Sequence, residues 1–259
     1  MKMHCVLSGS RMGSSWLQSL LWPYFREKEG YHKALGDAFV LRNWMYDTGT
    51  DIDYIRTGMT EQQVRNMPID RTFEYERRFE LLRKYVHRNR RYFMKIDSRV
   101  WTANLSQESW TNLHVGHKPI IIERRDKREV ALSHAIALNS NHYAIRVADD
   151  CQKFVKGPLT GDMAHIIADD LFSFYDAKKL IMDSPLEYLH VEYEDVVEEP
   201  DYIKRYLFPD YDEYVKDFKS PFHRIGNFIN KEDYITNLDY FNEWFESMEK
   251  TYDAFASNR

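Results

Sequence analysis

Short apolar runs alternate along this chain with longer segments in which apolar residues recur at helical spacing. Runs of strand length occupy residues 3–7, 39–41, 92–96, 119–122 and 187–191. Helical spacing, which places one apolar stripe on each helix, extends over residues 16–21, 71–91, 162–182 and 231–255. Because strands that alternate with helices form parallel sheets, the pattern predicts an α/β fold with a central parallel sheet of about four or five strands flanked by helices.

The length of 259 residues is ordinary for a single α/β domain, so we expect one domain over residues 1–259. With 36 Lys and Arg against 41 Asp and Glu, the net charge is −5, which excludes a general attraction to nucleic acid or to an anionic membrane. No run reaches the ~18–20 apolar residues of a membrane span, and the first residues enter a strand pattern without a signal-peptide core. Two cysteines, Cys5 and Cys151, fit a reduced compartment, and we expect a soluble cytoplasmic protein.

The segment after the first apolar run is rich in small residues and reads Gly-Ser-Arg-Met-Gly-Ser-Ser-Trp over positions 9–16. Small residues let the backbone turn tightly and direct several N–H groups at one anion, and a following helix adds its positive dipole end. Either Ser14 or Ser15 is placed to cap that helix. The loop therefore predicts a bound phosphate or sulfate ester. It lacks the Lys that follows the last Gly in nucleotide-triphosphatase loops, and Arg11 is its only cation.

Two later segments complete a pattern of three motifs. After the apolar run at 119–122, the chain reads Glu-Arg-Arg-Asp-Lys-Arg-Glu-Val-Ala-Leu-Ser, so that an Arg ends a strand and Ser133 follows two turns into the next helix. Residues 189–200 read Leu-His-Val-Glu-Tyr-Glu-Asp-Val-Val-Glu-Glu-Pro. In order and separation, the three motifs resemble the sulfotransferases that use 3′-phosphoadenosine 5′-phosphosulfate (PAPS). This resemblance covers most of the chain and implies a P-loop-containing nucleotide hydrolase-like sulfotransferase architecture.

The resemblance also implies a donor site. The loop for the 5′-phosphosulfate would comprise Arg11, Met12, Gly13, Ser14, Ser15 and Trp16, of which Met12 is the unusual member. Arg125 and Ser133 correspond to the pair that holds the 3′-phosphate, with Arg124 and Arg128 either assisting or forming ordinary ion pairs. Tyr193 corresponds to a residue near the adenine. Arg224 and Gly226 resemble a late segment that closes over the 3′-phosphate, although Arg224 also fits an ordinary loop position.

Sulfuryl transfer requires an acceptor oxygen in line with the sulfur and the leaving phosphate oxygen, together with cations that stabilise the charge. Arg11 fits the cation on the leaving phosphate. Lys95 either polarises the sulfuryl oxygens or simply ends its strand. The general base is open between two carboxylates: Asp97 stands where cytosolic relatives have a His, and Asp37 matches branches that present a carboxylate after the first helix. Either Asp also fits a cap or turn position.

Two charged stretches and two segments that could bind the acceptor also stand out in the sequence. Residues 71–91 are basic and form either a solvated helix face or a contact surface for an anionic acceptor. Residues 192–217 are acidic, and we interpret them as a solvated shell around the third motif. Residues 43–90, a variable region, and 140–165 are expected to form the acceptor pocket. We expect no metal, because His114 and His117 have no third ligand placed by the sequence.

The sequence thus predicts an enzyme that transfers a sulfuryl group from PAPS to a hydroxyl or amine of a small-molecule or glycan acceptor and releases adenosine 3′,5′-bisphosphate. A P-loop nucleotide or small-molecule kinase is an alternative, because it would use a similar anion-binding loop. The missing Lys after Gly13 counts against a kinase, and no Asp that could bind Mg²⁺ follows a strand in an obvious way. A catalytically inactive binding module on the same fold is the other alternative, because the His of cytosolic relatives is absent.

Overall fold

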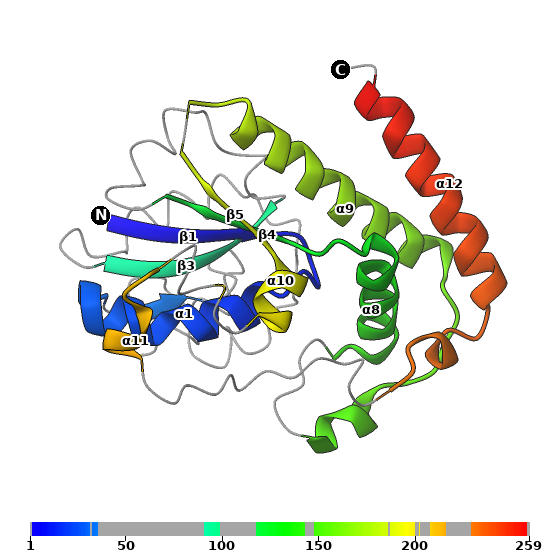
Figure 1. The fold of residues 1–259 in the computed structure, drawn as a ribbon. Helices are drawn as coiled ribbons and strands as arrows, with labels where there is room; N and C mark the ends of the chain where they lie inside the picture. The colour runs from blue at the N-terminus through cyan, green and yellow to red at the C-terminus, as the bar shows by residue number, and fades with distance from the viewer. Residues whose placement is uncertain are drawn as a thin grey trace, which may run out of the picture.

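The structure, a computed structural model, describes residues 2–31, 33–35, 91–98, 118–142, 148–185, 187–199, 202, 208–215 and 229–257. Within these residues, five parallel strands form one open sheet in the order β2-β3-β1-β4-β5 (Figure 1). The strands are β1 (Lys2–Ser8), β2 (Lys33–Leu35), β3 (Arg91–Asp97), β4 (Ile120–Glu123) and β5 (Leu189–Glu192). The predicted α/β class with a parallel sheet is confirmed. The strand predicted at 39–41 lies outside the described residues.

Helices connect and cover these strands. They are α1 (Ser14–Glu29), α8 (Lys127–Ser140), α9 (Gly161–Met182), α10 (Tyr193–Glu198), α11 (Tyr211–Tyr214) and α12 (Leu238–Ser257), with 3₁₀ turns η2 (Ala148–Lys153) and η5 (Glu232–Tyr234). Helix α9 agrees with its predicted range. The last helix begins later than predicted, because η5 and a bridge between Gly157 and Ile235 come first. The helix predicted at 71–91 lies outside the described residues except for Arg91, which begins β3.

The core lies on both faces of the sheet, because successive strand residues point to opposite sides. On one face, Val6 and Ile120 pack against α1, together with α10 and α11. On the other face, Cys5, Leu7 and Ile121 pack against α8, α9 and α12. Figure 1 shows α1 along one face, α9 along the other and α12 beside α9. Each fully buried aliphatic side chain contributes about 1.5–3 kcal/mol, which holds the strand ends in a fixed arrangement.

The sheet topology places the loop that follows β1 beside the loop that follows β4. The chain leaves β1 toward β2 and β3 on one side and later returns to β4 on the other side, so the chain reverses direction across the sheet at β1. Ligands of open α/β sheets bind beyond the carboxyl ends of the strands at such a point. Leu7 of β1 pairs with Ile121 of β4, so both strands end at the same edge. Among the described helices, none is both long and apolar enough to span a bilayer.

Candidate anion-binding site

The loop between β1 and α1 has an unusual backbone conformation. Arg11 and Gly13 both adopt the left-handed region, with φ of 65° and 88°. A left-handed non-glycine residue costs about 1–3 kcal/mol and recurs at ligand-binding loops. Helix α1 begins at Ser14 with Gly13 as its N-cap, so the prediction that Ser14 or Ser15 caps it is wrong. Because Gly13 has no side chain, it does not cap the N–H groups of the first turn. N–H groups that no side chain caps at a helix N-terminus are suited to bind an anion.

Met12, the unusual member of the loop motif, is a packing residue. Its side chain is 1% exposed and belongs to the core on the α8 and α9 face. A methyl group added at Gly9 would lie 3.0 Å from its Cε, so the two residues pack closely. Met12 thus anchors the loop to the core by its side chain.

Arg11 joins two motifs that are far apart in the sequence. Its Nε donates a hydrogen bond to Oγ of Ser133, at 3.3 Å, across 122 positions of the chain. Ser133 is buried on α8, two turns after the helix begins, as the spacing indicated. The loop assigned to the 5′-phosphosulfate and the serine assigned to the 3′-phosphate therefore lie in direct contact.

Lys95 adds a second cation beside the loop. It lies on β3, and its Nζ donates to Oγ of Ser15 at 3.1 Å. Asp97, two residues further, is the backbone partner of Ser8, so β3 ends next to the start of the loop. The other base candidate, Asp37, lies outside the described residues. Arg224 and Gly226 also lie outside them.

Tyr193, the first residue of α10, contacts residues of both other motifs. Its ring lies so close to Gly13 that a Cβ there would be 2.3 Å from its Cδ2. The ring of Trp16 meets it edge-on at 5.6 Å between centroids. The guanidinium of Arg124 lies over the ring of Tyr193, with Cζ 5.0 Å from the ring centroid. The third motif is therefore brought to the other two through this aromatic ring.

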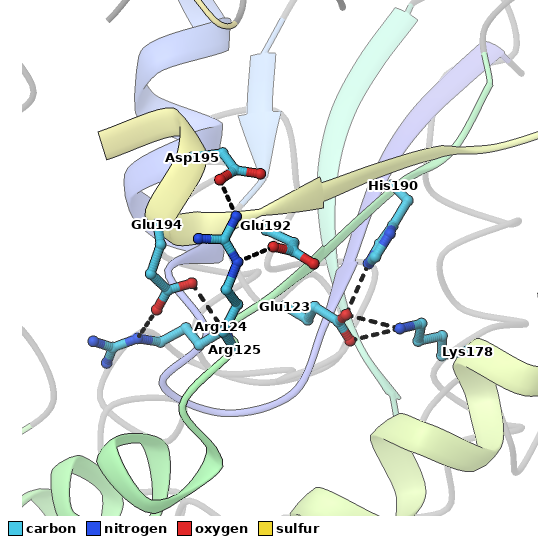
Figure 2. Close-up of polar contacts among 8 residues, drawn as sticks. All are labelled: Glu123, Arg124, Arg125, Lys178, His190, Glu192, Glu194 and Asp195. Carbon is cyan, nitrogen blue, oxygen red and sulfur yellow. Dashed lines mark hydrogen bonds and ion pairs between the residues drawn. The ribbon is translucent and has the colours of Figure 1, made fainter. Parts of the chain in front are cut away.

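The acidic turn at the start of α10 holds the two arginines that follow β4 (Figure 2). Arg125 forms ion pairs with Glu192 and Asp195. Glu194 accepts a hydrogen bond from the backbone N–H of Arg125 at 3.1 Å and lies 3.5 Å from Nε of Arg124. These three acids thus bind arginines and do not only form a solvated shell.

Arg124 and Arg128 both form ion pairs, which is one of the two alternatives that the sequence left open, and Arg125 does so as well. Arg124 is nearly buried, with a side chain 10% exposed, whereas the side chain of Arg125 is 50% exposed. Arg128 pairs with Glu232 at 2.7 Å and also donates to Asn242 on α12. All three arginines therefore have acidic partners in this structure.

Lys231 is a cation of the site that sequence reasoning missed. It is 6% exposed, and its Nζ binds the carboxylate of Glu129 on α8. Burial lowers the pKa of Lys231, although its bond to Glu129 opposes the shift. The positive charges of Arg124 and Arg11 lower that pKa further, so both arginines lie within electrostatic reach of Lys231. No local pattern marks Lys231, because it reaches the site from a separate segment.

Glu123 anchors the end of β4 on the α9 side. Both of its carboxylate oxygens lie 2.8 Å from Nζ of Lys178, and Nε2 of His190 is 3.0 Å away (Figure 2). Burial raises the pKa of Glu123, but the hydrogen bonds from His190 and Lys178 outweigh it, so that the pKa lies below its ordinary value. Its register partner is Glu192 of β5, and the two like charges are balanced by separate cations.

In chemical terms, the site combines helix N–H groups, two serine hydroxyls and several cations at the carboxyl edge of the sheet, which suits an anionic group. Across the described part of the chain, no three His, Cys, Asp or Glu side chains come together as ligands for a metal ion. No protein-family model matches the chain. No curated protein matches it with significant similarity.

Proposed function

We propose that this protein is a sulfotransferase that moves a sulfuryl group from PAPS to a hydroxyl or amine acceptor and releases adenosine 3′,5′-bisphosphate. The hydrogen bond between Arg11 and Ser133 carries the proposal, because it brings together the two segments expected to hold opposite ends of one donor. A ligand with an anionic group at each end fits such a pair of adjacent segments better than a ligand with one. On this proposal the fold is a P-loop-like sulfotransferase fold.

The loop supports binding of the 5′-phosphosulfate. The helix terminus after Gly13 offers backbone N–H groups, and Arg11 and Lys95 supply positive charge from two sides. In the transfer, the acceptor oxygen forms a bond to sulfur while the bond from sulfur to the phosphate oxygen breaks. These cations would stabilise the charge that develops on the leaving phosphate. The acceptor proton passes to a general base.

The base remains a choice between Asp97 and Asp37. The register of β3 against β1 favours Asp97, because its backbone lies beside Ser8, where the loop begins. A carboxylate in this role requires an environment that raises its pKa toward the working pH. Comparing Asp97→Asn with Asp37→Asn for turnover at unchanged donor affinity identifies the base.

Calorimetry tests the donor class. We expect adenosine 3′,5′-bisphosphate to bind without magnesium, and Arg11→Met to weaken this binding by about 2 kcal/mol, or roughly 30-fold, through loss of a charge-assisted contact. Arg26→Met is the matched control, because Arg26 is an exposed residue of α1 that forms an ion pair with its neighbour Glu27. Binding of Mg²⁺-ATP alone would instead establish the kinase.

Turnover with labelled PAPS and a panel of hydroxyl and amine acceptors separates an enzyme from a binding module. Transfer of label supports the sulfotransferase. Tight bisphosphate binding without transfer to any acceptor of a broad panel favours the inactive module.

A further inference from the structure

Arg125 is held by two carboxylates that come from one turn. Glu192 is the last residue of β5 and Asp195 lies in the first turn of α10, and both pair with the guanidinium of Arg125 (Figure 2). The side chain of Arg125 is 50% exposed, and each carboxylate side chain is 32% exposed. Solvent therefore reaches this ion-pair cluster, and so can a dissolved anion.

The charges of the turn between β5 and α10 do not favour an additional anion. Glu192, Glu194 and Asp195 place three carboxylates against the two guanidiniums of Arg124 and Arg125. An anion that approaches Arg125 meets an excess of one negative charge, and it must replace carboxylates that already bind the guanidinium. A phosphate dianion is suited to this replacement, because it carries more charge than a carboxylate and offers three acceptor oxygens.

The backbone of the turn between β4 and α8, which carries Arg125, is held independently of the guanidinium. The N–H of Arg125 donates to Glu194 at 3.1 Å, and Asp126 caps α8 by accepting from the N–H of Glu129 at 2.9 Å. On the opposite side, Glu123 is fixed by Lys178. The side chain of Arg125 can therefore exchange partners while the turn between β4 and α8 keeps its conformation.

We propose that Glu192 and Asp195 are competing counter-ions for Arg125, which occupy its guanidinium in the free protein and yield it to the second phosphate of the donor. This inference rests on the proposed function. The two acids set how tightly the bisphosphate is held, because each binding event must displace them and each release event restores their ion pairs. They thereby weaken retention of the product, adenosine 3′,5′-bisphosphate, at the end of a reaction cycle.

Titration calorimetry of Glu192→Gln, Asp195→Asn and the double variant tests this inference, with two nucleotides as probes. We expect the double variant to bind adenosine 3′,5′-bisphosphate at least about fivefold more tightly than the wild type, with a slower dissociation rate in stopped-flow. Affinity for adenosine 5′-monophosphate, which lacks the second phosphate, should stay within about twofold. Glu198→Gln, at an exposed acid of the same helix, matches the change in net charge of each single variant.

Each single variant keeps one of the two ion pairs and provides the test if the double variant does not fold. We expect each to bind the bisphosphate more tightly than the wild type, by a smaller factor than the double variant. Bisphosphate binding that these substitutions leave unchanged or weaken overturns the inference and leaves the proposed function intact. If neither the wild type nor any variant binds the bisphosphate, the proposed function fails, and the inference fails with it.

Discussion

At the scale of single residues, position 13 imposes two constraints that together require glycine. Its φ of 88° lies in the left-handed region, and the ring of Tyr193 fills the space that a side chain would need. The close approach brings the third motif against the first, so the glycine determines how tightly the site assembles.

Gly13→Ala is expected to cost about 2–4 kcal/mol of unfolding free energy, because left-handed strain adds to a displaced ring. Gly30→Ala is the matched control: Gly30 has a φ of 63°, but apart from its own chain neighbours no atom of the described residues lies within 4 Å of an added Cβ. We expect about 1 kcal/mol there, from strain alone. Urea unfolding of both variants measures the difference. Equal costs would show that the contact with Tyr193 has no energetic consequence.

Glu123 should make stability depend on pH. Its pKa in the folded protein lies below the ordinary value of 4.5, so its contribution is present above pH 4.5 and is lost as the pH falls through the folded pKa. Glu123→Gln is expected to cost about 2 kcal/mol at pH 7, because Lys178 loses its partner, and progressively less as the pH falls below 4.5 through the folded pKa.

Unfolding of the wild type and Glu123→Gln at pH 7 and at a series of pH values below 4.5 measures this effect. Glu187→Gln is the control, because Glu187 is 77% exposed and pairs with Lys118 at 3.1 Å. Such exposed pairs contribute about 0–1 kcal/mol. A Glu123→Gln effect that does not change with pH contradicts the assigned ionisation.

At the scale of elements, the start of α8 orients the site. The helix begins after the turn that carries Arg124 and Arg125, and Ser133 follows on the same helix. Its N-cap, Asp126, accepts a hydrogen bond from the N–H of Glu129, which in turn binds Lys231. The cap therefore fixes the first turn of α8, which carries Glu129 and follows directly on Arg124 and Arg125.

Asp126→Ala is expected to lower stability by about 1 kcal/mol and to weaken bisphosphate binding several-fold, because the first turn of α8 loses its cap. Thr160→Ala removes the corresponding cap of α9, where Thr160 accepts from the N–H of Met163 at 3.3 Å. We expect a similar loss of stability there without a change in affinity. Unfolding and calorimetry on both variants separate the two effects; equal losses of affinity would refute a specific role for α8.

At the scale of the whole molecule, a bound bisphosphate would connect the ends of β1 and β4 through the loop and α8. Ligand at about 100-fold its Kd stabilises the folded state by about 2.7 kcal/mol, which corresponds to roughly 5–10 °C in Tm at this chain length. Thermal unfolding without magnesium measures the shift, with adenosine 5′-monophosphate as the control that should stabilise less. A shift only with Mg²⁺-ATP would argue for the kinase.

Several elements could be predicted because their local pattern is unambiguous. The strands β1, β3, β4 and β5 are apolar runs between polar segments, and α9 shows a long apolar stripe with the Thr160 cap before it. The strand β2 has only the residues Lys-Ala-Leu, which is too short a run to mark a strand. Helix α12 was predicted to begin too early, because helical spacing does not distinguish a 3₁₀ turn from the helix that follows it.

Local sequence was enough to predict the alternation of strands and helices, the tight loop around Gly13 and the candidate anion-binding residues, since each depends on neighbours along the chain. The contacts between distant polar side chains, in contrast, depend on the tertiary fold. Arg11 reaches Ser133 across 122 positions, and Arg125 reaches Glu192 across 67. Lys231 reaches Glu129 across 102 positions. Such pairings depend on strand order and register, which bring distant segments to one edge of the sheet and leave no periodic trace in the sequence.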